Sequence, residues 1–201
     1  MRDFYAKEAA RSVYYFSEHE VRYERLRPRL EILDFRKPGT NTYAIRFICL
    51  DGKVYVSGDI GDAIYSNYGP GWLLKDWATV ELDYFAEKCD ASGRGRGSKE
   101  WDCGYADESL KCLVAEWDAE DDVDEETKAL RKESLKDALQ NTATQYEWSK
   151  WLEAEGEGLF GSDWWEHSEV GMRIGLRTHL HLIALRMAIS KLKSQEPVTE
   201  N

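Results

Sequence analysis

The sequence predicts an α+β fold, with a small antiparallel β-meander at about residues 30–66 packed against a helical C-terminal half. Two observations support this class. Residues 30–66 hold runs of strand-forming side chains separated by Asp-Gly and Gly-Asp turns. From Leu73 onward, apolar residues recur at the three- and four-residue spacing of a helix.

The same patterns divide the chain into three segments. Residues 1–70 are expected to hold an N-terminal helix and the sheet. Residues 71–195 are expected to form a helical part of the same domain or a helical subdomain, because Tyr68-Gly69-Pro70-Gly71 breaks the pattern between them. Residues 196–201 are expected to be a disordered tail.

The first two elements are a helix and a strand. Phe4, Ala9 or Val13, and Phe16 recur at helical spacing, so we predict a helix over residues 3–18. The segment RLEILDFRK lies between two prolines that cannot continue regular structure, and it is predicted to form the first strand.

The strongest local pattern is a β-hairpin formed by TYAIRFICL and KVYVSG. The Asp51-Gly52 pair between these segments favours a two-residue type I′ turn. This turn fixes a register in which one face of the hairpin is apolar. The facing pairs are Cys49 with Val54, Phe47 with Val56, and Ile45 with Gly58.

A second turn is predicted at Asp59-Ile60-Gly61. Gly61 takes the left-handed conformation there, because Ile60 would resist a positive φ. In that register Asp62 lies opposite Gly58 and Ile64 lies opposite Val56.

The remainder of the chain is predicted to be helical. We expect helices over residues 74–89, 107–117, 125–139 and 143–154, with a Gly-rich basic loop over residues 90–104. The segment GMRIGLRTHLHLIALRMAISKLK then carries two adjacent apolar stripes, which predict a helix buried over a broad face. The stripes are Leu176, Leu180, Ile183 and Met187, and Leu182, Leu185, Ile189 and Leu192.

Composition narrows the class of protein. The net charge of −11 argues against attraction to nucleic acid or anionic lipid and favours a basic protein surface as the partner. We expect no signal peptide or membrane anchor, because charged residues interrupt the N-terminal segment and no 18-residue apolar run follows. The four cysteines form no CxxC pair, so we expect reduced, mostly buried thiols in a cytoplasm.

The residues considered for chemistry have structural alternatives. Asp59 and Asp62 lack the additional oxygen ligands that magnesium or calcium requires, and turn chemistry already explains Asp59. Asp62 is not required by the turn, and either has a role of its own or caps a helix that begins at Ala63. His167 is the histidine with the most binding-capable neighbours, Trp164 and Trp165. No cofactor and no metal site is predicted.

Two charged segments are candidate binding surfaces. Arg94 and Arg96 lie in GRGRG, which either contacts an anion or is a mobile loop, since it lacks the Lys-Ser/Thr ending of a P-loop. Eight of the residues 116–126 are acidic. This run is either a solvated linker whose last acids favour the start of the next helix, or a surface that occupies a basic groove. Its candidate contacts are Asp118, Glu120, Asp121, Asp122, Asp124, Glu125 and Glu126.

Several strings resemble a family of small, uncharacterised proteins encoded by bacteriophages and prophages. The strings are VSGDIGDAIY, LDYFAEKCDASGRG, KEWD and HLIALRMA, and the resemblance covers about residues 40–104 and 172–189. It implies a setting among accessory phage functions in a bacterial host cytoplasm, where inhibitors such as anti-CRISPR proteins are common.

Three functions therefore remain open. The first is an acidic phage protein that inhibits a host nucleic-acid-handling complex, such as a CRISPR effector, by protein–protein contact and without binding nucleic acid or membrane. The second is a small enzyme that uses Asp59 or Asp62 together with a histidine, such as His167, or with the GRGRG loop. The third is a structural or regulatory accessory protein without inhibitory activity. The oligomeric state is not predicted.

Overall fold

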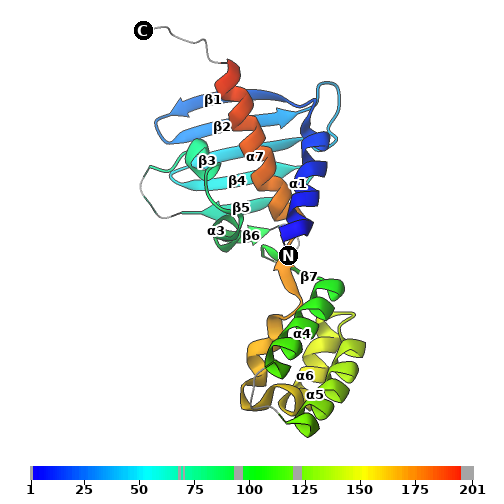
Figure 1. Ribbon diagram of the computed structural model, residues 1–201. Coiled ribbons are helices and arrows are strands. Elements are labelled where there is room, and N and C mark those ends of the chain that lie inside the picture. Colours follow the sequence, from blue (N-terminus) through cyan, green and yellow to red (C-terminus); the bar gives the residue numbers. More distant parts are fainter. Residues whose placement is uncertain (1, 68, 70, 93–96, 120–123, 196–201) are drawn as a thin grey trace. The chain divides into compact units, whose positions relative to one another are not determined.

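The computed structural model describes residues 2–67, 69, 71–92, 97–119 and 124–195 (Figure 1). It confirms the predicted α+β class. The chain forms two compact units, which we call the sheet unit (residues 1–98 and 174–201) and the helical unit (residues 99–173). The chain passes between the two units after Ser98 and before Ile174. The predicted tail lies outside the described residues.

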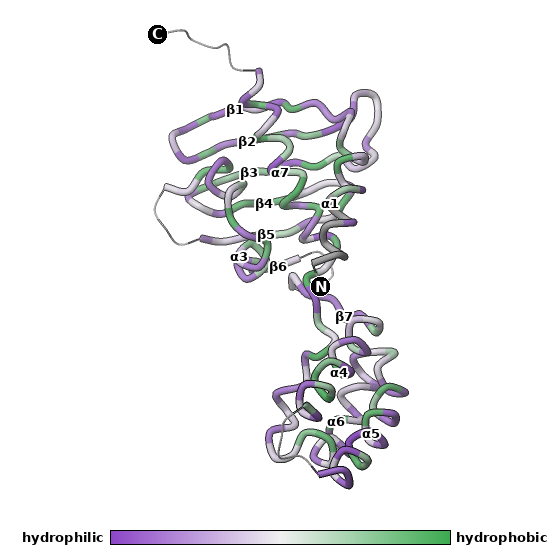
Figure 2. The backbone as a smooth tube through the Cα atoms, viewed as in Figure 1, coloured by the Kyte–Doolittle hydropathy of each residue, from purple (hydrophilic) through white to green (hydrophobic). Residues whose placement is uncertain are grey.

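The sheet unit is built on a six-stranded antiparallel meander, in which each strand pairs with the next along the chain (Figure 1). The predicted meander is confirmed, and one further strand lies on each side of it. Figure 2 shows the inner strand β3 mostly green and the edge strand β1 mostly purple. The strands are β1 Glu20–Arg27, β2 Leu30–Arg36, β3 Ile45–Leu50, β4 Lys53–Gly58, β5 Ala63–Ser66 and β6 Cys89–Ser92.

Two helices from opposite ends of the chain cover one face of this sheet (Figure 1). Helix α1 spans Arg2–Phe16 and helix α7 spans Leu176–Gln195. In α1, Phe16 is fully buried, whereas Val13 is 55% exposed, so the alternative that includes Val13 in the apolar stripe is wrong. Helix α7 is buried over a broad face as predicted, except that Leu176 at its start is exposed. No helix in the described part of the chain is long and apolar enough to cross a membrane.

The core of the sheet unit lies between the sheet and these helices. Alternate residues of the strands point into it, because successive side chains of a strand face opposite sides. The opposite face of the sheet stays accessible, with Arg46, Tyr55 and Ser57 exposed on β3 and β4. The largest fully buried side chains of this core are Phe16, Leu33, Phe35, Phe47, Tyr65, Leu74, Trp77, Phe85, Leu182 and Leu185.

The hairpin of β3 and β4 has the predicted register. Ile45 pairs with Gly58, Phe47 with Val56 and Cys49 with Val54. Asp51 and Gly52 have φ angles of 49° and 84°, as a type I′ turn requires. The Asp-Gly pair and the apolar face specify the same pairing, which explains why this prediction succeeded.

The turn between β4 and β5 differs from the prediction by one residue. Val56 pairs with Ala63 and Tyr55 with Ile64, so placing Ile64 opposite Val56 and Asp62 opposite Gly58 was wrong. The shift turns Tyr65, rather than Ile64, towards the core. There Tyr65 stacks on Phe85 with 4.0 Å between ring centroids, and its hydroxyl lies 2.9 Å from Nδ1 of His181.

The predicted helix over residues 74–89 is broken into α2 Leu74–Trp77 and α3 Leu82–Glu87. The carboxylate of Asp76 accepts a hydrogen bond from the Leu73 amide at 2.9 Å and so closes the start of α2. In the break, Arg186 of α7 donates to the carbonyl groups of Ala78 and Val80. A side chain far along the sequence thus satisfies the backbone that a continuous helix would have paired.

The described part of the helical unit contains three main helices. Those predicted over residues 107–117, 125–139 and 143–154 are confirmed with longer or shifted ends, whereas the predicted loop over 90–104 contains β6, β7 and the start of α4. Helix α4 begins early because Asp102 accepts a hydrogen bond from the Tyr105 amide at 2.7 Å. The elements are β7 Lys99–Trp101, α4 Cys103–Asp118, α5 Glu125–Ala138, η1 Leu139–Asn141, α6 Gln145–Phe160, η2 Gly161–Glu169 and β8 Met172–Ile174.

Tryptophan supplies much of the core of the helical unit. Trp148 is fully buried and stacks on Trp151 with 5.2 Å between ring centroids. The remaining buried residues are Leu110, Val114, Ala138, Leu152 and Leu159. This core explains why the segment 145–160, rich in aromatic residues, forms one long helix.

Gly58 is expected to be indispensable for the hairpin. Its φ is +142°, and an added Cβ would lie 2.2 Å from the carbonyl oxygen of Ala44. We predict that Gly58→Ala lowers the free energy of unfolding by about 3 kcal/mol or more, because both the backbone conformation and the close contact are violated. Urea unfolding measures the loss. Gly39→Ala is the matched control, because Gly39 also has a positive φ but no atom within 4 Å of the added Cβ; it should cost about 1 kcal/mol. Equal losses would contradict the close-contact argument.

Stability is expected to decline in mild acid through His181. Burial lowers the pKa of this histidine far below its ordinary value, so the folded protein holds it neutral while the unfolded chain takes up a proton. The contribution of the neutral His181 to the free energy of unfolding is therefore fully present above about pH 6.5. Below that pH the free energy of unfolding decreases by up to about 1.4 kcal/mol per pH unit for this one group. Burial also lowers the pKa of His19 and of His167, which adds to the effect.

Urea unfolding between pH 8 and pH 5 tests this prediction. His181→Asn is expected to be less stable at pH 7, because the contact with Tyr65 is altered, but to lose less stability on acidification. An unchanged pH dependence in this variant would show that His181 is not the group responsible.

Candidate functional site

The first Gly-Asp pair is explained by the turn. One carboxylate oxygen of Asp59 accepts a hydrogen bond from the Tyr43 amide at 2.8 Å, and its own amide donates to the Ala44 carbonyl at 2.9 Å. Both contacts hold the loop before β3 against the end of β4. Asp59 is therefore a structural residue in this unit, as its place in the turn predicted.

Asp62 remains without an assigned contact. It is exposed, and within the described residues its carboxylate makes no hydrogen bond and no ion pair. The alternative that Asp62 caps a helix is wrong, because strand β5 begins at Ala63.

His167 is packed among aromatic rings of the helical unit. Its ring stacks on Phe160 with 4.0 Å between ring centroids and meets Trp117 edge-on at 6.0 Å. Its backbone carbonyl accepts a hydrogen bond from Nε1 of Trp148 at 3.0 Å. Burial lowers the pKa of His167. His167 is therefore a half-buried residue that packs on aromatic rings of the helical unit. Asp59 and Asp62 lie in the sheet unit.

The described part of the acidic run has local partners. Asp118 lies 3.6 Å from Arg131, and Glu125 lies 3.2 Å from Lys128. Asp124 is the N-cap of α5, where it accepts a hydrogen bond from the Thr127 amide at 2.7 Å, and this bond lowers its pKa. Glu126 is exposed. Asp124 therefore stabilises the start of α5, as one of the two alternatives for the acidic run predicted.

The remaining candidate binding residues lie partly outside the described part of the chain and partly in the helical unit. Glu120, Asp121 and Asp122 lie outside the described residues, as do Arg94 and Arg96. Trp164 is half-buried beside Gly156, whereas Trp165 is 54% exposed. The two rings meet edge-on, with 6.2 Å between ring centroids. Trp165 is thus the member of the pair that is available to a partner.

The structure reveals an acidic groove between α5 and α6 that the sequence did not predict. Its volume is about 230 Å³. Leu130 and Trp151 supply its apolar surface, and Leu130 is 61% exposed. We define this acidic groove by its lining residues, Leu130, Glu133, Ser134, Asp137, Trp151, Glu155 and Gly158.

The groove combines negative charge with a fixed geometry. None of its lining residues is basic, and three are carboxylates. One of them, Asp137, accepts a hydrogen bond from Nε1 of Trp151 at 2.6 Å, which fixes its orientation. Such a groove suits a cationic side chain with a long aliphatic stem.

Negative charge is concentrated in the helical unit. Residues 99–173 hold eight Lys and Arg against 21 Asp and Glu, a net charge of −13. The sheet unit holds 19 against 17, a net charge of +2. The acidity of the whole chain is therefore a property of one unit, and the groove lies within it.

The four cysteines are free thiols, as predicted, but their burial differs from the prediction. Cys49 is buried, which raises the pKa of its thiol to about 12. Cys89 is half-buried, and Cys103 and Cys112 are exposed on α4. Across the described residues, no three His, Cys, Asp or Glu side chains gather to hold a metal ion.

No family model matches the chain, and comparisons with curated proteins and with solved structures gave no match.

The two aspartates of the Gly-Asp pairs are expected to respond differently to substitution. Asp59→Ala removes the acceptor for the Tyr43 amide and should lower the free energy of unfolding by about 1 kcal/mol. Asp62→Ala should change it by less than about 0.5 kcal/mol. Parallel urea titrations of the two variants test this difference. A large loss for Asp62→Ala would reveal a contact that the structure does not contain.

Proposed function

We propose that the chain is a protein-binding module, and that the acidic groove of its helical unit takes a basic segment of a partner protein. The observation that carries this proposal is the meeting of the exposed Leu130 with the carboxylates of Glu133, Asp137 and Glu155 in one groove. Exposed leucines are common, but one that lines a hollow with three carboxylates matches the mixed chemistry of Lys and Arg side chains.

A lysine or arginine fits this groove in two parts. Its aliphatic stem lies against Leu130 and Trp151, and its charged end reaches the carboxylates on either side. Asp137 is already oriented by Trp151, so less side-chain entropy is lost when the partner binds. The net charge of −13 on the helical unit speeds the approach of a basic partner and makes binding sensitive to salt.

The specific form of this proposal is a phage-encoded inhibitor of a host nucleic-acid-handling defence complex, of the anti-CRISPR type. Proteins that handle nucleic acid carry basic surfaces, because they must neutralise phosphates. An acidic unit that occupies such a surface competes with the nucleic acid directly. The resemblance of strings such as VSGDIGDAIY and LDYFAEKCDASGRG to phage proteins supports this setting, which also implies the cytoplasm of a bacterial host.

Substitutions in the groove are expected to weaken this binding. Glu133→Gln with Glu155→Gln removes two groove charges and should weaken binding of an Arg- and Lys-rich peptide by about threefold to tenfold at low salt. Leu130→Ala should weaken it further. Fluorescence anisotropy with a labelled peptide measures the change.

The control is Glu108→Gln with Glu116→Gln, which changes the net charge equally at exposed positions of α4 outside the groove. Equal weakening by both pairs would show that total charge, and not the groove, determines binding. A second experiment tests inhibition itself by measuring binding to a purified CRISPR effector and the effector's nuclease activity. Groove-dependent binding that leaves the nuclease active would reject the inhibitor and leave a binding protein with a regulatory or structural role.

A further inference from the structure

The exposed face of the sheet carries a row of charged and polar side chains that the strand register brings together. Arg22 of β1 pairs with Asp34 of β2, Asp34 with Arg46 of β3, and Arg46 with Ser57 of β4. Residues paired in this way point to the same face and lie about 5 Å apart. Arg36 lies two residues along β2 from Asp34 and so belongs to the same face.

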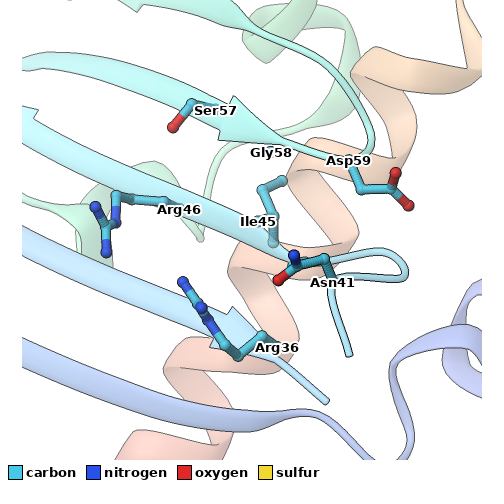
Figure 3. Close-up of a pocket in the computed structure, with 8 residues that line it drawn as sticks. Arg36, Asn41, Ile45, Arg46, Ser57, Gly58 and Asp59 are labelled. Carbon is cyan, nitrogen blue, oxygen red and sulfur yellow. The ribbon is translucent and has the colours of Figure 1, made fainter. Parts of the chain in front are cut away.

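A hollow of about 370 Å³ lies beside this row, at the ends of β2, β3 and β4. Figure 3 shows Arg36, Arg46, Asn41 and Ser57 extending over the same surface. The first two belong to β2 and β3, Asn41 to the loop between them, and Ser57 to β4. Within the described residues, the side-chain amide of Asn41 and the hydroxyl of Ser57 make no hydrogen bond to the protein. Their donors are therefore available to a ligand.

Arg36 and Arg46 are both oriented by Asp34, and together they carry one more positive charge than this carboxylate can neutralise. Asp34 accepts hydrogen bonds from Nε and Nη2 of Arg46 at 2.6 and 2.9 Å, and lies 3.4 Å from Arg36. The bond to Arg46 lowers the pKa of Asp34, so the carboxylate stays charged. One carboxylate thus orients two guanidinium groups but neutralises only one of them.

Asp59 lines the hollow as well, but its carboxylate serves the backbone. One oxygen accepts from the Tyr43 amide at 2.8 Å, and in Figure 3 the group points away from the two arginines. The end of the hollow that holds Arg36 and Arg46 therefore has a local excess of positive charge, although the chain as a whole is acidic.

We propose that this hollow binds the phosphate group of a small phosphate monoester. Four donor side chains from different elements surround the space, which suits the several oxygens and the higher charge of a phosphate better than a carboxylate with two oxygens. The net charge of −11 opposes a long polyanion, so the ligand is small.

The neighbouring row of the sheet provides a surface for the remainder of such a ligand. Ile32, Ile48, Tyr55 and Ile64 pair across four strands on the same exposed face. Tyr55 is 38% exposed. On β3 this row lies two residues from Arg46, about 7 Å away. A planar apolar body attached to the phosphate can therefore rest on Tyr55. This site goes beyond the proposed function and does not depend on it.

Titration of the full-length ¹⁵N-labelled protein with phenyl phosphate tests the proposal. Saturable amide shifts are expected at Asn41, Arg46 and Ser57, with inorganic phosphate binding more weakly at the same residues. Arg36→Gln should weaken phenyl phosphate at least about fivefold, because one charge-assisted contact is lost. This variant leaves the Asp34–Arg46 pair intact, so its fold is preserved.

Arg29→Gln is the matched control. Arg29 lies outside the hollow, pairs with Asp51 at 3.7 Å and is 61% exposed, so this variant should bind phenyl phosphate as the original protein does. Equal weakening in both variants, or no saturable shift at the hollow, would overturn the site. Acetate binding as tightly as phosphate would replace the phosphate assignment with a carboxylate. A single-stranded oligonucleotide binding more tightly than phenyl phosphate would overturn the assignment of a small ligand.

Discussion

The packing of α7 against one face of the sheet is the interaction on which the rest of the structure depends. This helix comes from the end of the chain and buries Leu182, Leu185 and Ile189 against strands from its first third. It also places His181 against Tyr65, and so fixes which residues of β5 face inward. Because all the described helices of the sheet unit contribute to this one core, the other face of the sheet is left for Arg36, Arg46 and Tyr55.

Features that depend on residues close together in the sequence could be predicted from local patterns. The Asp51-Gly52 turn and the apolar face of β3 and β4 specify the same register, so the fold class and this hairpin could be read from the sequence. The one-residue shift at β5 could not, because it depends on Tyr65 meeting Phe85 and His181, which are distant in sequence. Strand β1 was missed for a related reason: only Val21 and Tyr23 of its residues pack on the core, and the alternating charges around them conceal the pattern.

Neither candidate site was predictable from the sequence. The acidic run over 116–126 is conspicuous, yet Asp118, Asp124 and Glu125 have partners within or next to their own helices. The groove instead joins Glu133 of α5 to Glu155 of α6, two ordinary surface acids that only the packing of the helices brings together. The arginine hollow was hidden by the net charge of −11, which is the sum of −13 on the helical unit and +2 on the sheet unit.

The helical unit is an insertion, and its two junctions meet within the sheet unit. Gly175 donates its amide to the carbonyl of Ser98 at 2.8 Å, and Thr178 reaches the same carbonyl from the first turn of α7. The chain therefore leaves the sheet unit and returns to it at neighbouring points, as tolerated domain insertions do. All six strands of this sheet come before Lys99 in the chain, so replacing the inserted unit would leave every strand pair of the sheet in place.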